Sequence, residues 1–369
     1  MNPGLYIHIP FCEQRCYYCA FTVAVSPENT FEPYVQRLVR EIELSSLGDL
    51  AETIYVGGGT PSLLSAKLLG RVLRACPSRG AVEISIEINP GTLTFDKVAQ
   101  YRELGINRGS LGAQSLEDED LQRAGRLHKA QAVFADFDLL RRGGFTNINL
   151  DLIAGLPNQK LETWTRNLDR AIELRPEHVS VYMLDQEERS AWAKLPPDVP
   201  DEGDFADFYT EAEHRLGDAG YHHYEISNWA LPGRECRHNI GYWTGVPYRG
   251  VGVGAHSYDG RRRFWNTSSL AEYAEILDSG RLPLCGEEIL TPPLRLEEAF
   301  MLGLRQDRGV DVRALASTLG IDYPSGWHVR VEQLQDAGWI RFDGTILQLT
   351  AKGRLAASSV IEEMIWPTP

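Results

Sequence analysis

Three closely spaced cysteines constrain this chain more than any other feature of its sequence. Cys12, Cys16 and Cys19 are separated by three and then two residues, and they follow an apolar segment at residues 5–9 that we expect to be a strand. A closed structural zinc site takes four protein ligands, and a [4Fe-4S] cluster has four irons to ligate. Three thiolates without a fourth close by therefore leave one metal position open, where a small molecule can chelate.

The composition excludes several classes of protein. The 369 residues carry a net charge of 37 − 51 = −14, which disfavours nucleic acid or an anionic membrane surface as a partner. No apolar run reaches transmembrane length, and the N-terminus enters a strand without a signal peptide. Six cysteines in a chain of this length do not form a disulfide framework, and cluster thiolates need a reducing compartment. We therefore expect a soluble, cytoplasmic protein.

Strands alternate with helices through the first half of the chain. The predicted strands are residues 5–9, 53–56, 82–88, 110–113, 147–153 and 179–184, with helices near 31–44, from 65, 95–104, 129–142 and 161–174. This alternation favours parallel strands with right-handed crossovers. Six units predict an α/β fold built as a partial (β/α)6 TIM-like barrel that stays open. The polar and Gly-rich segments all follow strand ends, and that edge is the catalytic face of β/α barrels.

The repeat breaks after residue 184. The sequence predicts an irregular stretch at 196–200 and a helix at 205–219, followed by the segments 224–227 and 236–243, a Gly-rich segment at 250–256 and a linker at 283–293. Helices at 294–304, 312–319 and 329–337, a hairpin across Asp343-Gly344 and a last helix at 352–364 resemble a small winged-helix-like domain. We expect domains at 1–230 (partial barrel), 231–290 (connecting segment) and 291–369 (C-terminal helical domain).

The cysteine spacing resembles that of the radical S-adenosylmethionine (SAM) superfamily. The flanking sequence segments are YIHIPFC, which ends at Cys12, and CYYCAF, which starts at Cys16. They resemble the segments of the coproporphyrinogen-dehydrogenase-like branch of this superfamily, and within it those of the heme chaperone HemW family. The resemblance covers nearly the whole chain and is thin in the tail. It implies that Cys12, Cys16 and Cys19 hold a [4Fe-4S] cluster and that SAM binds its open iron.

The same resemblance implies a set of SAM-binding residues. The motif GGGTP supplies Gly58, Gly59 and Thr60, and the other matched positions are Glu87, Gln114, Arg126, Asp151, Asp185, His256, Tyr6 and Tyr18. Taken alone, the glycines are equally consistent with a tight turn, and either tyrosine with the core. For Glu87, a solvated strand end is the less favoured alternative. Asp185 and His256 match positions that contact SAM mainly through the backbone.

A second motif surrounds His238. In the segment 236–243, CRHNIGYW, His238 and Tyr242 would share one face of a helix, four residues apart. A lone histidine beside a tryptophan is more often a core residue, but the resemblance implies that His238 is an axial heme ligand. Cys236 could assist it, whereas Cys76 and Cys285 resemble ordinary thiols.

The resemblance predicts a heme chaperone that delivers heme to apo-hemoproteins such as respiratory proteins. Phe21 stands where coproporphyrinogen dehydrogenases have a fourth cysteine, and Cys12 lies almost at the chain start. Both differences disfavour a coproporphyrinogen III dehydrogenase, and the histidine motif disfavours a radical SAM methyltransferase or cyclopropanase. A zinc-bound scaffold is a further alternative. We also expect a homodimer, with membrane clients reached peripherally; whether the protein is itself an enzyme stays open.

Overall fold

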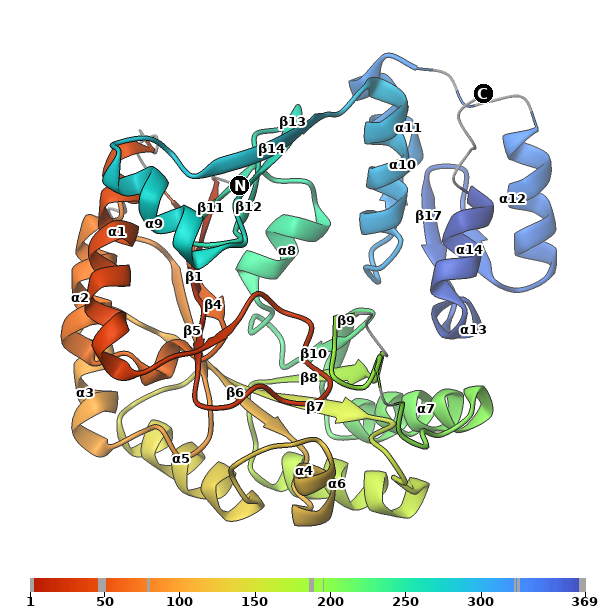
Figure 1. Ribbon diagram of the computed structural model, residues 1–369. Helices are drawn as coiled ribbons and strands as arrows, with labels where there is room; N and C mark the ends of the chain where they lie inside the picture. The colour runs from red at the N-terminus through yellow and green to blue at the C-terminus, as the bar shows by residue number, and fades with distance from the viewer. Residues whose placement is uncertain are drawn as a thin grey trace.

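The computed structural model describes residues 3–45, 51–77, 80–185, 189–194, 196–321, 323 and 326–364. One sheet of twelve strands organises most of them, in the order β14-β13-β12-β11-β1-β4-β5-β6-β7-β8-β10-β9. The sheet curves but does not close (Figure 1). Among the described residues, no helix is both long enough and apolar enough to cross a membrane.

The six predicted parallel strands form the middle of this sheet in chain order. They are β1 (Gly4–Ile9), β4 (Thr53–Gly58), β5 (Glu83–Ile88), β6 (Arg108–Gln114), β7 (Ile148–Ala154) and β8 (His178–Met183). Each pairs in parallel with the next. The partial barrel expected from the alternation of strands and helices is therefore confirmed.

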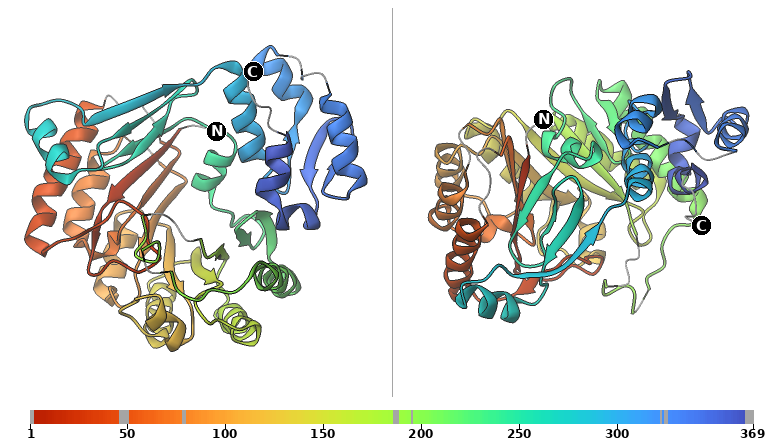
Figure 2. Two further views of the ribbon diagram at one scale, coloured as in Figure 1. Left: turned by 45° about the vertical axis from the view of Figure 1, so that its right-hand side comes forward. Right: turned by 90° about the horizontal axis from the view of Figure 1, so that it is seen from above.

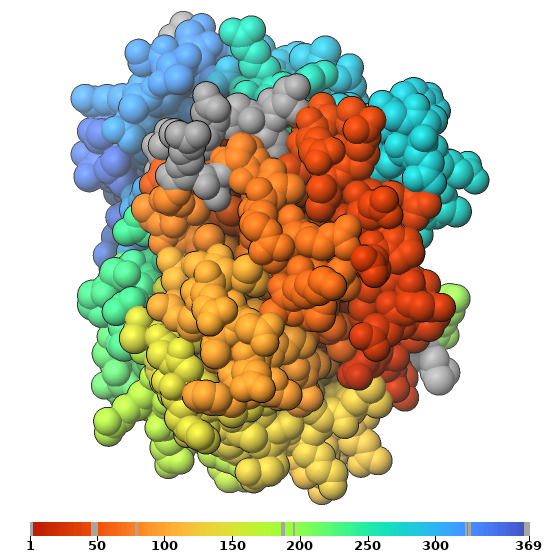
Figure 3. Space-filling view, turned by 90° about the vertical axis from the view of Figure 1, so that its left-hand side faces the viewer, coloured from red at the N-terminus to blue at the C-terminus, as the bar shows by residue number. Residues whose placement is uncertain are grey.

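Helices cover the outer face of the parallel strands. They are α1 (Phe31–Leu44), α2 (Ala66–Ala75), α3 (Phe95–Glu103), α4 (Asp118–Arg123), α5 (Ala130–Arg142) and α6 (Leu161–Glu173). Helix α1 buries Tyr34, Leu38 and Ile42, the period-four stripe visible in the sequence. Ser65 begins α2 by accepting a hydrogen bond from the backbone of Leu68. Figure 3 shows this outer face, with α1 in red and α2 and α3 in orange.

Strands that the sequence did not predict extend both edges of the sheet. At one edge, β10 (Asn228–Ala230) and β9 (His222–Glu225) follow β8, and α7 (Glu202–Asp218) precedes them. At the other, β11 (Tyr248–Val251) pairs in parallel with β1. The strands β12 (His256–Tyr258), β13 (Arg262–Asn266) and β14 (Leu284–Ile289) continue antiparallel from β11, while α8 (Arg237–Trp243) and α9 (Leu270–Asp278) connect parts of this edge.

The predicted linker at 283–293 is therefore wrong. Residues 284–289 form the last strand of the sheet, and helix α10 (Pro292–Gly303) begins soon after it. The strand is hard to recognise because its side chains are largely exposed and two of its six residues are glutamates. It is held by ion pairs across to β13, from Arg262 to Glu287 at 2.6 Å and from Arg263 to Glu288 at 3.6 Å.

The C-terminal region has its own small hydrophobic core, which includes Phe300, Trp327 and Leu347. After α10 it contains β15 (Val310–Asp311), α11 (Val312–Leu319), α12 (Trp327–Asp336), β16 (Ile340–Phe342), β17 (Ile346–Leu349), α13 (Ala351–Leu355) and α14 (Ala357–Met364). The three strands form a separate sheet in the order β15-β17-β16. The predicted helices and hairpin are confirmed, except that the last helix is divided near Ala356.

This region reaches both edges of the open sheet. The chain joins it to β14 at one edge, and two backbone hydrogen bonds join it to β9 at the other. These run from Ile226 N–H to the Arg305 carbonyl at 2.9 Å and from Asp307 N–H to the Tyr224 carbonyl at 3.1 Å. In Figure 2 the blue C-terminal region lies beside the barrel rather than beneath it. Helix α8 lies between α10 and the strands (Figure 1).

Candidate cofactor site

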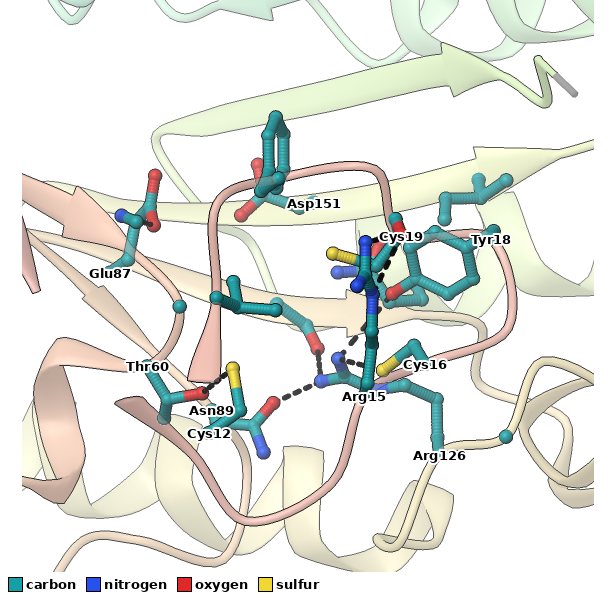
Figure 4. Close-up of a pocket in the computed structure, with 18 of the residues that line it drawn as sticks. Cys12, Arg15, Cys16, Tyr18, Cys19, Thr60, Glu87, Asn89, Arg126 and Asp151 are labelled. Carbon is teal, nitrogen blue, oxygen red and sulfur yellow. Dashed lines mark hydrogen bonds between the residues drawn. The ribbon is translucent and has the colours of Figure 1, made fainter. Parts of the chain in front are cut away.

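The three cysteines surround one cavity of about 430 Å³ at the carboxyl ends of the parallel strands. Their loop starts at β2 (Phe11–Cys12) and returns through β3 (Ala24–Val25), which pairs with β2. All three thiols are free and partly exposed, and Figure 4 shows them around the same space. Within the described ranges, no three His, Cys, Asp or Glu side chains are placed to hold a single metal ion.

Polar groups contact the sulfur atoms individually. The Thr60 hydroxyl donates to Cys12 Sγ at 3.6 Å, and Arg126 Nη1 donates to Cys16 Sγ at 3.5 Å (Figure 4). Burial raises the pKa of Cys12 to about 11 and also raises the pKa of Cys19. The nearby guanidinium opposes this effect, because a positive charge favours the thiolate that a metal requires.

The glycine motif brings two segments of backbone into close approach. A Cβ atom at Gly59 would lie 2.7 Å from the Phe11 carbonyl oxygen and 2.8 Å from the Pro10 carbonyl carbon. Gly58 has φ +123°, a value that residues other than glycine rarely adopt. Its N–H donates to Glu87 Oε2 at 3.0 Å. The motif is therefore more than a turn, since it fits the strand end against the start of the cysteine loop.

Glu87 lines the cavity beside this motif, where it accepts the hydrogen bond from the Gly58 N–H. Burial raises its pKa to about 7, and the charge of Asp151 adds to the shift, while the Gly58 N–H and the Tyr55 hydroxyl at 3.1 Å oppose it. A carboxyl group in this state gains most from a cationic partner, because such a partner favours its charged form. The position is thus suited to an ammonium or to sugar hydroxyls.

The raised pKa of Glu87 predicts a pH effect on stability. Between the ordinary value of 4.5 and about 7, the folded carboxyl holds a proton that the unfolded chain releases. The folded state therefore loses stability as the pH rises through this window. We expect the Tm of cluster-free protein to fall from pH 5 to pH 7.5, and the Glu87→Gln variant to show a smaller fall. If the Tm of both proteins fell by the same amount between pH 5 and pH 7.5, the raised pKa would not belong to Glu87.

Arg126 occupies the centre of the site. Its Nη2 donates to the Gly112 carbonyl at 2.9 Å and to Asn89 Oδ1, and its Nη1 reaches the Tyr18 hydroxyl at 3.4 Å. Its Nε is buried and has no hydrogen-bond partner, which is costly for a charged group. The orphaned donor points to an anionic group, such as a carboxylate, that completes the site.

Two further predicted residues line the same wall. Gln114 has φ +65° where β6 shifts register against β7, and strained backbone of this kind is often found at ligand sites. Asp151 accepts from the Ser110 hydroxyl at 3.1 Å and from the Asn149 amide at 2.8 Å. These bonds leave acceptor capacity on a carboxylate, as ribose hydroxyls would require. Asp185 also lines the cavity and is exposed.

Tyr6 and His256 lie outside this cavity. Both line a larger neighbouring cavity instead, where the Tyr6 hydroxyl lies 3.0 Å from His8 Nδ1 and the His256 ring stacks on Trp265. Of the residues predicted for the cluster and SAM, the structure leaves Tyr6 and His256 apart and brings together Cys12, Cys16, Cys19, Tyr18, Gly58, Gly59, Thr60, Glu87, Gln114, Arg126, Asp151 and Asp185.

The sequence prediction missed Tyr55 and Asn89, which also line the cavity. Asn89 contacts Arg126, and Tyr55 contacts Glu87. Strand alternation carried a signal for Tyr55, because it lies two residues before Gly57 and directly opposite Tyr6 in the sheet.

His238 is a buried residue at the start of α8, only 3% exposed. Glu83 accepts a hydrogen bond from its N–H at 3.1 Å, which anchors the helix start. Both ring nitrogens are occupied, Nδ1 by the Thr53 hydroxyl at 2.9 Å and Nε2 by the Tyr242 hydroxyl at 2.8 Å. Burial lowers the pKa of His238 to about 3, so the ring is neutral. The imidazole is held in place but is not open to a ligand in this arrangement.

The donor set around the 430 Å³ cavity fits a three-cysteine cluster with a chelating, zwitterionic ligand. Three thiols leave one metal position open, the Arg126 Nε lacks a partner, and Glu87 and Asp151 supply acceptors across the same space. Together with the open barrel, this site defines a radical SAM protein. The Radical SAM superfamily pattern matches residues 6–171, and the HemN C-terminal domain pattern matches residues 290–356.

Comparison with curated proteins narrows the class further. The chain is 34% identical to the heme chaperone HemW of Bacillus subtilis, over 96% of this chain and 97% of that protein. It is 41% identical to the HemW of Escherichia coli, over 69% of each chain. Among solved structures, it is similar to the E. coli coproporphyrinogen III oxidase HemN, a radical SAM enzyme, with a TM-score of 0.87 and 25% identity over 99% of this chain and 90% of that one. The chain belongs to the heme chaperone HemW family.

Proposed function

We propose that this protein binds heme and delivers it to apo-hemoproteins such as respiratory proteins. The observation that carries the proposal is similarity along almost the whole chain to proteins named heme chaperones, at 34% identity over 96% of its length. Phe21, exposed at the edge of the cysteine cavity, stands where coproporphyrinogen dehydrogenases have their fourth cysteine. This difference supports a chaperone over that enzyme.

In this proposal the cofactor cavity holds a [4Fe-4S] cluster on Cys12, Cys16 and Cys19, with SAM at the open iron. When bound, such a cluster supplies single electrons to the ligand it chelates. Arg126 pairs with the carboxylate of SAM and balances the thiolate charge, while Asp151 accepts from ribose hydroxyls. Gly58, Gly59 and Thr60 keep the loop closely packed beside the SAM amine.

His238 is the proposed axial ligand to heme iron. Its contact with Thr53 fixes the orientation of the ring, as second-shell partners do for ligating histidines. The neutral ring is the form that binds a metal. Ligation at Nε2 requires that Tyr242 leave this nitrogen, while Thr53 and stacking on Tyr55 at 5.3 Å still hold the ring.

We further propose the domain boundaries 1–230, 231–290 and 291–369, a cytoplasmic location, and a homodimer that forms with the cluster in place. Light scattering of the protein before and after cluster reconstitution tests the last point. A mass that stays that of one chain in both states would exclude it.

Heme titration tests the assignment of His238. The His238→Ala variant is expected to bind ferric heme weaker by a factor of about ten or more and to lose the Soret band of the histidine complex. The His214→Ala variant, which changes an exposed histidine on α7, serves as the matched control and should behave as the parent. Equal affinity and equal spectra for all three proteins would show that His238 is not the ligand.

A further inference from the structure

The larger cavity has a volume of about 960 Å³ and lies between the barrel and the C-terminal region. It shares Gly58 and Glu87 with the cofactor cavity, so the two spaces adjoin. Its walls come from β1, from the segment that runs from α8 to β12, and from α10 and α11. Aromatic side chains dominate the middle segment: Tyr242, Trp243, Tyr248 and Tyr258. Flat aromatic walls suit a large planar ligand, because rings stack on one another over a wide area.

Cationic side chains line the same cavity from the side of α10. Arg295 and Arg308 make no side-chain hydrogen bond or ion pair with any described residue, whereas Arg263 pairs with Glu288 and Glu298. A guanidinium binds a carboxylate through two parallel hydrogen bonds, so the two free arginines suit a ligand that carries carboxylates at one edge.

Tyr242 separates this cavity from His238. Tyr242 lines both the large cavity and a smaller one, whereas His238 lines the smaller one alone. The rings meet edge to face at 4.9 Å, and the Tyr242 hydroxyl occupies Nε2. The phenol of Tyr242 is a stronger hydrogen-bond donor than the hydroxyl of Thr53. This difference favours the tautomer in which Nε2 accepts from Tyr242 and Nδ1 carries the proton and donates to Thr53. The nitrogen covered by Tyr242 is thus the one that iron would need.

We propose that the large cavity is the tetrapyrrole site, that Arg295 and Arg308 bind its carboxylates, and that Tyr242 caps the Nε2 of His238 until the iron displaces it. This inference rests on the proposed heme-binding function and adds where the heme lies and what holds it. The tetrapyrrole then lies beside Glu87, at the border of the cofactor cavity.

Metal-free porphyrin tests the carboxylate contacts without iron ligation. The parent protein is expected to bind protoporphyrin IX about tenfold tighter than its dimethyl ester, measured by quenching of tryptophan fluorescence. The double variant Arg295→Gln/Arg308→Gln should lose this preference, while Arg281→Gln, an exposed arginine after α9, should keep it. An equal preference in the double variant and the parent would overturn the placement of the carboxylates.

Ferric heme tests the cap. The Tyr242→Phe variant is expected to bind heme about threefold to tenfold tighter, since one hydrogen bond of about 0.5–1.5 kcal/mol no longer has to break, with an unchanged Soret position. A shifted Soret band in this variant would make Tyr242 a ligand and overturn the cap. The His256→Ala variant should keep the Soret position of the parent. If His256→Ala loses the Soret band of the parent while His238→Ala keeps it, His256 is the ligand and the inference is overturned.

The proposed function and the inference fail in different ways. If the parent takes up neither heme nor metal-free porphyrin, the proposed function is wrong. If the parent binds heme through His238 while the arginine and Tyr242 variants match it in every titration, only the placement in the large cavity is wrong.

Discussion

Replacing Cys16 by serine is expected to abolish assembly of the iron–sulfur cluster almost completely. Three thiols surround the cavity, so the loss of one leaves two ligands for four irons. Cys16 is also the thiol that Arg126 contacts at 3.5 Å. After anaerobic reconstitution, the variant should lack the visible iron–sulfur absorption and retain little iron or labile sulfide.

Cys285→Ser is the matched control for this experiment. Cys285 is a free, exposed thiol on β14 and does not line the cofactor cavity. It should reconstitute with as much iron and sulfide as the parent. A Cys16→Ser protein with the same iron content and spectrum as this control would contradict the cluster assignment. Zinc in place of iron and sulfide in the parent would instead support a zinc scaffold.

Gly59→Ala is expected to destabilise the protein and to disturb the cofactor site at the same time. The added Cβ would meet the Phe11 carbonyl oxygen at 2.7 Å and the Pro10 backbone at 2.8 Å, and backbone cannot rotate away as a side chain can. Overpacking of this kind costs about 1–3 kcal/mol of unfolding free energy. It should also displace Thr60 from Cys12 and weaken SAM binding by a factor of about ten or more.

Gly217→Ala provides the comparison. Gly217 lies in helix α7, and a Cβ there would meet nothing within 4 Å. Alanine favours helix more than glycine does, so this variant should be at least as stable as the parent. Thermal unfolding and SAM titration of both variants check the prediction. Equal stability and equal SAM affinity for the Gly59 and Gly217 variants would contradict the close fit of the glycine motif.

The middle of the barrel was predictable because its signals are local. Each parallel strand reads as an apolar run that ends in a polar or Gly-rich segment, and the chain order of the strands equals their order in the sheet. Polar residues at the ends of parallel strands must share one edge. Glu87, Gln114 and Asp151 were therefore placed correctly around the cavity without any knowledge of their contacts.

The edges of the sheet were not predictable by the same reasoning. The side chains of strand β14 are largely exposed, and the strand is recognised by its pairing along β13, where Arg262 and Arg263 reach Glu287 and Glu288. Such long-range pairing has no local pattern. The prediction for His238 was incomplete for a similar reason, since the burial of the ring depends on Thr53, from a strand distant in sequence.

The two attachments of the C-terminal region have a mechanical consequence. Covalent continuity fixes one end of this region at β14. At the other end, the short ladder between residues 224–226 and 305–307 joins it to β9, together with the contacts of Asp307 with His222 and of Arg354 with Glu213. The C-terminal region thus spans the open side of the barrel, with a covalent connection at one end and non-covalent contacts at the other. A movement of the C-terminal region away from β9 therefore has to break these backbone and side-chain contacts together, while the connection to β14 stays intact.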